Sequence, residues 1–95
     1  MEKLTEDQVV TALKDAPDWS EVNGEIQRTY AFDDFVQSMH FVNKVADAAE
    51  QRQHHPDILI RYNKVMLTLS THDAGGITEK DFDLASACDD FASEA

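Results

Sequence analysis

The sequence predicts an α+β domain in which a four-stranded antiparallel sheet carries three helices on one face, in the order αββαββα. Two pairs of segments alternate apolar and polar residues as strands do, and each pair is interrupted by a turn signal. Three other segments repeat apolar residues with the helical period. Hairpins separated by helices favour an antiparallel sheet covered on one side. At 95 residues, the chain is expected to form one domain over residues 1–95.

The N-terminal part predicts a helix followed by a hairpin. Thr5 and Gln8 form a capping box that starts the helix, and Pro17 ends it. Asn23-Gly24 is a strong signal for a tight hairpin turn. The strands on either side of this turn are expected over residues 19–22 and 25–32. The apolar face of the helix is expected to comprise Val9, Val10 and Leu13.

The longest helix is expected between residues 33 and 51, where apolar residues recur at about 100° per residue. Pro56 disfavours helical geometry at His55, so this helix should end near His54. Phe41 lies off the predicted stripe, as Phe82 does on the last helix, and two exposed aromatics suggest a subunit interface. The predicted stripe comprises Phe35, Met39, Val42, Val45, Ala46 and Ala49.

The C-terminal part predicts a second hairpin and a final helix. The two strands are expected over residues 57–62 and 64–70, with Asn63 in the tight turn. Gly75-Gly76 interrupts the chain, and Thr78 with Asp81 forms a second capping box. The apolar face of the final helix is expected to comprise Leu84, Ala85, Cys88, Phe91 and Ala92.

Composition excludes several classes of function. With 8 Lys+Arg against 19 Asp+Glu the formal charge is -11, which repels a polyanion, so direct nucleic-acid binding is not expected. Cys88 is the one cysteine and is expected to be a small buried hydrophobe without a disulfide partner. No stretch approaches the roughly 20 apolar residues of a membrane span, nor is there a basic start followed by an apolar run. We expect a cytoplasmic protein with no membrane partner.

Three histidines mark the candidate site. His54 and His55 stand where the long helix must stop, and His72 follows the second strand of the second hairpin. A tight turn at Asn63 would bring all three to one rim of the sheet. Because an imidazole, with an unperturbed pKa of roughly 6.5, exchanges protons near neutral pH, this cluster predicts proton-transfer chemistry. A His-His pair alone is also typical of a solvent-facing helix end.

Other chemistries find less support in the sequence. No Cys-x-x-Cys, His-x-x-x-His or His-Glu-x-x-His spacing occurs, and adjacent histidines seldom both reach a zinc ion, so we expect no metal. A Gly-x-Ser-x-Gly nucleophile elbow is also missing. His40 is expected to be solvated. Capping explains Asp81 adequately, and an active-site role ranks second. Glu50 either bonds an imidazole or substrate, or is a solvated helix carboxylate.

The histidine segment resembles the pterin-4a-carbinolamine dehydratase family, also called 4a-hydroxytetrahydrobiopterin dehydratase. The family's signature places an acidic or basic residue one helical turn ahead of His-His-Pro, followed by an aromatic residue, a histidine and an aspartate. The resemblance covers the chain from the region of Trp19 through the final helix. Gln53 and Asp73 depart from residues that some members carry, an acidic residue and a glutamate respectively. The matching positions are Glu50, His54-His55-Pro56, Tyr62, His72 and Asp81.

The resemblance implies dehydration of 4a-hydroxytetrahydrobiopterin to quinonoid 6,7-dihydropterin and water, a step of tetrahydrobiopterin recycling. It implies that His54 and His72 are the acid and base, and that His55 orients the pterin or shares the proton transfer. We therefore expect a hydro-lyase that needs no cofactor. We also expect it to form a homo-oligomer, a dimer or tetramer, with helices packed between subunits. The implied pterin contacts are Glu50, Gln53, Ser70, Thr71 and Asp73, with Asp81 and Pro56 in supporting roles.

Two alternatives use the same scaffold. Animal members of the family also act as dimerisation cofactors for a homeodomain transcription factor, which would make the chain a protein-interaction module. A molybdopterin-related or other pterin-binding role is the third interpretation. Acceleration of hydroxypterin dehydration by the purified protein without a partner separates the enzyme from the interaction module.

Overall fold

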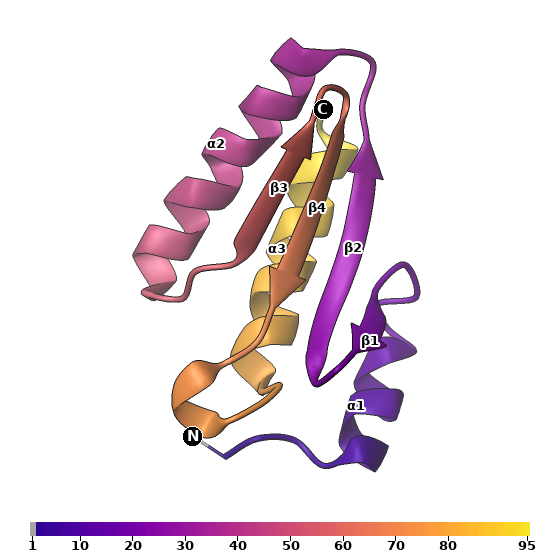
Figure 1. Cartoon of the computed structure of the whole chain (residues 1–95), viewed down its shortest axis with the longest axis vertical. Coiled ribbons are helices and arrows are strands. Elements are labelled where there is room, and N and C mark those ends of the chain that lie inside the picture. The colour runs from indigo at the N-terminus through magenta and orange to yellow at the C-terminus, as the bar shows by residue number, and fades with distance from the viewer. Residues whose placement is uncertain (1) are drawn as a thin grey trace.

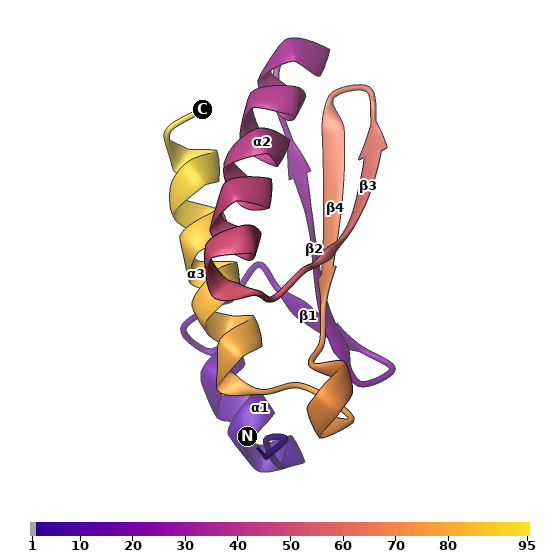
Figure 2. The same cartoon turned by 90° about the vertical axis from the view of Figure 1, so that its left-hand side faces the viewer.

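The computed structural model describes residues 2–95 and confirms the predicted fold. Its four strands form one antiparallel sheet in the order β1-β2-β4-β3 (Figure 1). Viewed from the side, α2 and α3 cover one face of this sheet, and α1 lies at the end of the same layer (Figure 2). The elements are α1 (Glu6–Leu13), β1 (Ser20–Val22), β2 (Glu25–Ala31), α2 (Phe35–Arg52), β3 (Asp57–Arg61), β4 (Lys64–Leu69), the 3₁₀ helix η1 (His72–Ala74) and α3 (Glu79–Ser93).

Both hairpin turns depend on left-handed residues. Asn23 and Gly24 have φ values of 53° and 80°, which is the backbone of the predicted two-residue turn between β1 and β2. In the second hairpin the left-handed residue is Tyr62, with φ of 53°. Asn63 completes that turn and donates from its side-chain amide to the carbonyl oxygen of Phe32 at 3.1 Å. The β3–β4 turn is thereby fastened to the end of β2.

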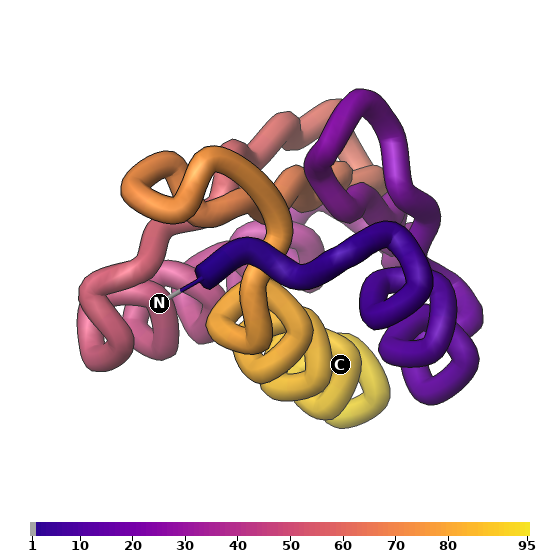
Figure 3. The backbone as a smooth tube through the Cα atoms, turned by 90° about the horizontal axis from the view of Figure 1, so that it is seen from below, coloured from indigo at the N-terminus to yellow at the C-terminus, as the bar shows by residue number. Residues whose placement is uncertain are grey.

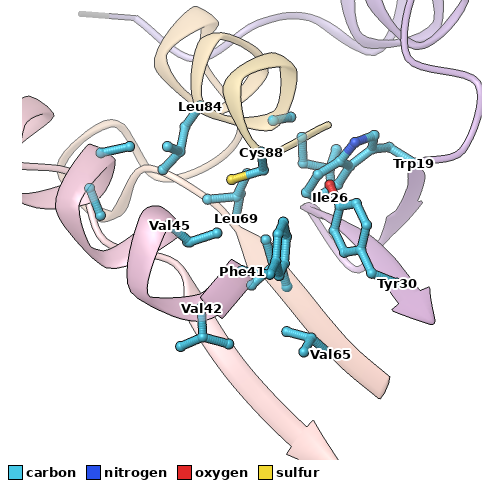
Figure 4. Close-up of a cluster of buried hydrophobic side chains, with 14 of the residues drawn as sticks. Trp19, Ile26, Tyr30, Phe41, Val42, Val45, Val65, Leu69, Leu84 and Cys88 are labelled. Carbon is cyan, nitrogen blue, oxygen red and sulfur yellow. The ribbon is translucent and has the colours of Figure 1, made fainter. Parts of the chain in front are cut away.

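The core lies between the sheet and the two long helices. The apolar face predicted for β4 is confirmed, because Val65, Leu67 and Leu69 are fully buried, and Thr68 on the opposite face is also buried. Ile26 and Tyr30 of β2 add to the same face (Figure 4). On α3, Leu84, Ala85 and Cys88 are buried as predicted.

The predicted apolar faces of α1 and α2 need correction. Phe41 was expected off the stripe, yet it is 1% exposed and its ring lies 4.6 Å from that of Tyr30. Helix α2 packs against α3 as well as β4, so its buried face is wider than one stripe. Phe35, in the first turn of α2, is exposed instead. Val10 of α1 is also exposed, because this short peripheral helix buries only Val9.

The subunit interface predicted from two exposed aromatic residues is therefore not supported. Phe41 belongs to the core, and Phe82 is partly buried against it. None of the helices described in residues 2–95 is both long and apolar enough to cross a membrane.

Candidate active site

The three candidate histidines lie at one end of the sheet. Strand β3 begins opposite the end of β4, because Asp57 pairs with Thr68. His54 and His55 immediately precede β3, and His72 shortly follows β4. Figure 3 shows the α2–β3 connection and η1 side by side at this end of the molecule. The backbone therefore gathers residues separated by the whole second hairpin.

A left-handed residue at the end of α2 directs the two histidines apart. The helix ends at Arg52, close to His54 as predicted, and Gln53 has φ of 50°. The N–H of His54 then donates to the carbonyl of Ala49 at 3.0 Å, as in a Schellman motif. The side chain of Gln53 donates to the carbonyl of Glu50 at 2.8 Å. The reversal turns His54 back toward the core.

His54 is paired with a buried carboxylate. Its Nε2 lies 2.5 Å from Oδ1 of Asp81, the third residue of α3. His54 is 8% exposed and Asp81 is fully buried. This contact joins two predicted site residues that are 27 positions apart in the sequence. Asp81 thus combines its capping role with direct support of an imidazole.

Two threonines complete the hydrogen bonding of Asp81. The hydroxyl of Thr71 donates to Oδ2 of Asp81 at 2.9 Å and lies 2.8 Å from the hydroxyl of Thr78. The backbone N–H of Thr78 also donates to Oδ2, at 2.9 Å, which completes the predicted capping box. All three residues are buried. The side chain of Thr71 is therefore directed at Asp81.

His55 faces the opposite way. Its Nε2 bonds to Oε2 of Glu50, and its side chain is 57% exposed. Glu50 is thus the partner of the outer histidine, one of the two possibilities that the sequence left open. Pro56 immediately precedes β3 and is partly buried. The pair presents a carboxylate and an imidazole to solvent.

The segment after β4 supplies the remaining candidates. His72 and Asp73 are exposed residues of η1, a short helix that the sequence did not predict. Gly75, with φ of 75°, ends η1. The hydroxyl of Ser70 donates to Oε2 of Glu25 at 3.2 Å, which links Ser70 to strand β2. His40 is exposed on α2, as predicted.

A second polar cluster, absent from the sequence prediction, surrounds Asp89. Its Oδ1 accepts from Trp19 at 3.1 Å, from Arg28 at 2.7 Å and from the hydroxyl of Tyr30 at 2.6 Å. Burial, reinforced by Asp89, raises the pKa of the Tyr30 phenol well above its ordinary value. Burial likewise raises the pKa of Cys88 to about 12. These partners come from distant segments, so no local pattern could have identified the cluster.

Within residues 2–95, no group of three or more His, Cys, Asp or Glu side chains is arranged to hold a metal ion. Two histidines of the candidate site pair with carboxylates instead, His54 with Asp81 and His55 with Glu50. A hydrogen-bonded imidazole of this kind is equipped for proton transfer.

Comparisons with known proteins identify the family of this chain. The family model "Pterin 4 alpha carbinolamine dehydratase" matches residues 2–91. A Gloeobacter violaceus protein, provisionally named pterin-4-alpha-carbinolamine dehydratase 2, is 56% identical over 91 residues, covering 92% of this chain and 99% of that protein. A Thermomicrobium roseum protein with a similar provisional name is 46% identical, covering 98% of this chain and 100% of its own length.

Solved structures give the same result. The crystal structure of a Brucella melitensis transcriptional coactivator/pterin dehydratase superposes with a TM-score of 0.93 at 34% identity, covering 96% of this chain and 99% of that one. A pterin dehydratase-like RuBisCO assembly factor of the alpha-carboxysome shares the fold alone, with a TM-score of 0.65 at 23% identity over 78% of this chain and 86% of its own. The chain therefore belongs to the pterin 4 alpha carbinolamine dehydratase family.

Proposed function

We propose that this chain dehydrates a 4a-hydroxytetrahydropterin, 4a-hydroxytetrahydrobiopterin in the first instance, to the quinonoid dihydropterin and water, as a cytoplasmic step of tetrahydrobiopterin recycling. The observation that carries the proposal is the His54–Asp81 pair, placed at the same end of the sheet as His55 and His72. Family membership over residues 2–91 supports the same chemistry.

The reaction needs an acid and a base in one place. Hydroxide is a poor leaving group from the 4a carbon and must be protonated, while a proton leaves the neighbouring ring nitrogen. We assign these transfers to His54 and His72, and we assign orientation of the pterin to His55 with Glu50. Gln53, Ser70 and Asp73 are the other proposed pterin contacts. General acid–base help of this kind is worth roughly 10²–10⁴-fold in rate.

The test replaces the proposed acid and base one at a time. We expect His54→Ala and His72→Ala each to lower dehydration by roughly 10²–10⁴-fold. Absorbance of the hydroxypterin, corrected for its spontaneous loss, measures the rate. His40→Ala is the matched control, because His40 is an exposed histidine about 18 Å along α2 from the end of that helix. Wild-type rates in both site variants would refute the assignment.

For the expected homo-oligomer we propose an interface at β3, in place of the helix packing that the resemblance implied. This strand lies at the edge of the sheet, and its residues read Asp-Ile-Leu-Ile-Arg. Antiparallel pairing with a second copy about Leu59 would place Asp57 opposite Arg61 of the partner, twice, with isoleucines between them. The strand is therefore complementary to itself in charge, and such pairing would cover the exposed side chains of Ile58 and Leu59.

Charge exchange tests this interface. Arg61→Asp should dissociate the oligomer, because each Asp57 would then face a second aspartate. The double variant Asp57→Arg/Arg61→Asp should restore association, since it rebuilds both ion pairs in reverse. Sedimentation velocity measures the mass of each form. A wild-type chain that sediments as a monomer at micromolar concentration would refute the interface.

A protein-interaction role is the second candidate, because the Brucella melitensis relative is described as a coactivator as well as a dehydratase. The two roles separate in one assay. Dehydration by the purified chain without any partner supports the enzyme, and a purified folded chain without activity supports the interaction module.

A further inference from the structure

The hydrogen bonds behind His54 run in one direction. Thr71 has one hydroxyl hydrogen and donates it to Oδ2 of Asp81. The 2.8 Å contact between the hydroxyls of Thr71 and Thr78 must therefore use the hydrogen of Thr78. The other contact of the Thr78 hydroxyl leaves this hydrogen available. There the oxygen accepts from the backbone N–H of Lys80, which uses a lone pair and not the hydrogen. The chain of donors runs from Thr78 through Thr71 to Asp81.

The donors at the end of this hydrogen-bond series determine which atom donates in the bond between Asp81 and His54. The backbone N–H of Thr78 is the second donor to Oδ2, and two donors at one oxygen stabilise the charged form of a carboxylate. A carboxylate has no hydrogen to give. The 2.5 Å bond between Oδ1 and Nε2 of His54 must then use the hydrogen of Nε2. In the neutral ring, Nδ1 is the nitrogen that carries the free lone pair.

We propose that Thr78, Thr71 and Asp81 are positioning residues that hold neutral His54 with its hydrogen on Nε2, so that Nδ1 is the nitrogen that exchanges a proton with the pterin. This inference rests on the proposed dehydration. Thr71 thereby acts through Asp81, not through a hydroxyl contact with the substrate. Burial of the three positioning residues keeps water from replacing any of these bonds.

Nitrogen NMR reads the tautomer directly and needs neither substrate nor turnover. In ¹⁵N-labelled wild-type protein, at a pH where the ring is neutral, we expect His54 to show a protonated Nε2 and an unprotonated Nδ1. The opposite pattern would overturn the proposal. An active protein with the opposite pattern would leave the dehydratase assignment intact, so the two hypotheses fail separately.

Asp81→Asn provides the sharpest variant. The amide oxygen should take the place of Oδ2, because the donors of Thr71 and Thr78 need an acceptor there. The amide NH₂ group then faces Nε2 of His54. Because this group only donates hydrogen bonds, Nε2 must act as the acceptor. We expect the hydrogen to move to Nδ1, so that the tautomer inverts. Retention of the Nε2–H form in this variant would overturn the proposed directional chain.

Matched variants separate positioning from stability. Asp83→Asn changes a 68% exposed carboxylate on the same helix and should leave the His54 tautomer unchanged. Thr71→Ser keeps the hydroxyl and should keep the wild-type kcat. Thr71→Val removes it and should lower kcat by up to about tenfold, at nearly constant KM, the rate equivalent of one lost hydrogen bond. A wild-type kcat in Thr71→Val would overturn the role of Thr71, even if Asp81→Asn failed to fold.

Discussion

Helix α3 carries two aspartates that collect hydrogen bonds, and their partners differ in kind. Asp81, in the first turn, is fully buried and accepts from a hydroxyl and a backbone N–H while it pairs with an imidazole. Asp89, two turns later, is 30% exposed and accepts from an indole, a guanidinium and a phenol. Both aspartates join segments that are distant in the sequence, but only Asp81 pairs with an imidazole.

The hydrogen-bond partners of each aspartate determine the role of its cluster. Arg28 stays charged and Trp19 keeps its hydrogen under ordinary conditions, and the pKa of Tyr30 is raised by burial and by Asp89. The partners of Asp89 therefore hold their protons, and this cluster fastens α3 to β2. His54 can release a proton, so the cluster around Asp81 suits chemistry. Four predictions test this contrast.

The largest expected effect is on rate. Asp81→Asn should lower kcat for pterin dehydration by about 10²–10⁴-fold, because Nδ1 of His54 then carries the hydrogen and has no free lone pair for the substrate. The folded Asp89→Asn variant should dehydrate the pterin with a kcat close to that of the wild type. Steady-state kinetics of both variants, with folding checked by circular dichroism, make the comparison. Equal losses of kcat would remove the distinction between the two clusters.

The second prediction concerns stability. Asp89→Ala leaves Arg28, Trp19 and Tyr30 without their shared acceptor, so we expect the free energy of unfolding to fall by about 2–4 kcal/mol. Urea denaturation measures this change. If the free energy of unfolding falls by less than the loss of a surface salt bridge would cause, solvent replaces the carboxylate as the acceptor at this site.

The third prediction uses Cys88, the neighbour of Asp89. Burial raises the pKa of its thiol from 9.0 to about 12, so the folded state holds this proton more tightly than the unfolded state. Stability is therefore fully present below pH 9 and should fall by about 1 kcal/mol per pH unit as the pH rises toward 12. Urea midpoints from pH 8 to 11, compared with Cys88→Ala, test this. A Cys88→Ala variant with the same alkaline slope would assign the loss to other groups.

The smallest effect is expected at the surface. Arg52 and Asp83 form an ion pair at 2.9 Å with a 68% exposed carboxylate. Asp83→Ala should change the free energy of unfolding by about 0–1 kcal/mol, because solvent screens the pair. The same urea titration sets the baseline for the Asp89 variant. A loss above 2 kcal/mol would mean that this pair holds α2 and α3 together more strongly than its exposure indicates.

Local sequence patterns predicted much of this structure because their physical causes are local. Alternation along β4, the Asn23-Gly24 turn and the capping box of Thr78 and Asp81 each depend on residues that are close in the chain. Phe41 was misplaced for the opposite reason. Its burial comes from β2 and the β2–α2 connection, where the rings of Tyr30 and Phe32 lie against it.

The candidate site likewise combines features that the sequence predicts with one that depends on tertiary packing. The motif around His54, His55 and His72 could be found from the sequence, and pairing of the second hairpin was sufficient to predict that the three share one end of the sheet. The contact of Asp81 with His54 could not be predicted, since it spans 27 residues and depends on how α3 packs against α2.

By itself, then, the sequence determined the order of helices and strands, the turns between them and the identity of the candidate proton carriers, because periodicity, caps and left-handed residues act within a few positions. Only tertiary structure decided which histidine is buried and which is exposed, and which aspartate each polar group meets. Those outcomes depend on desolvation and on hydrogen bonds between distant segments, which exist only once the helices cover the sheet.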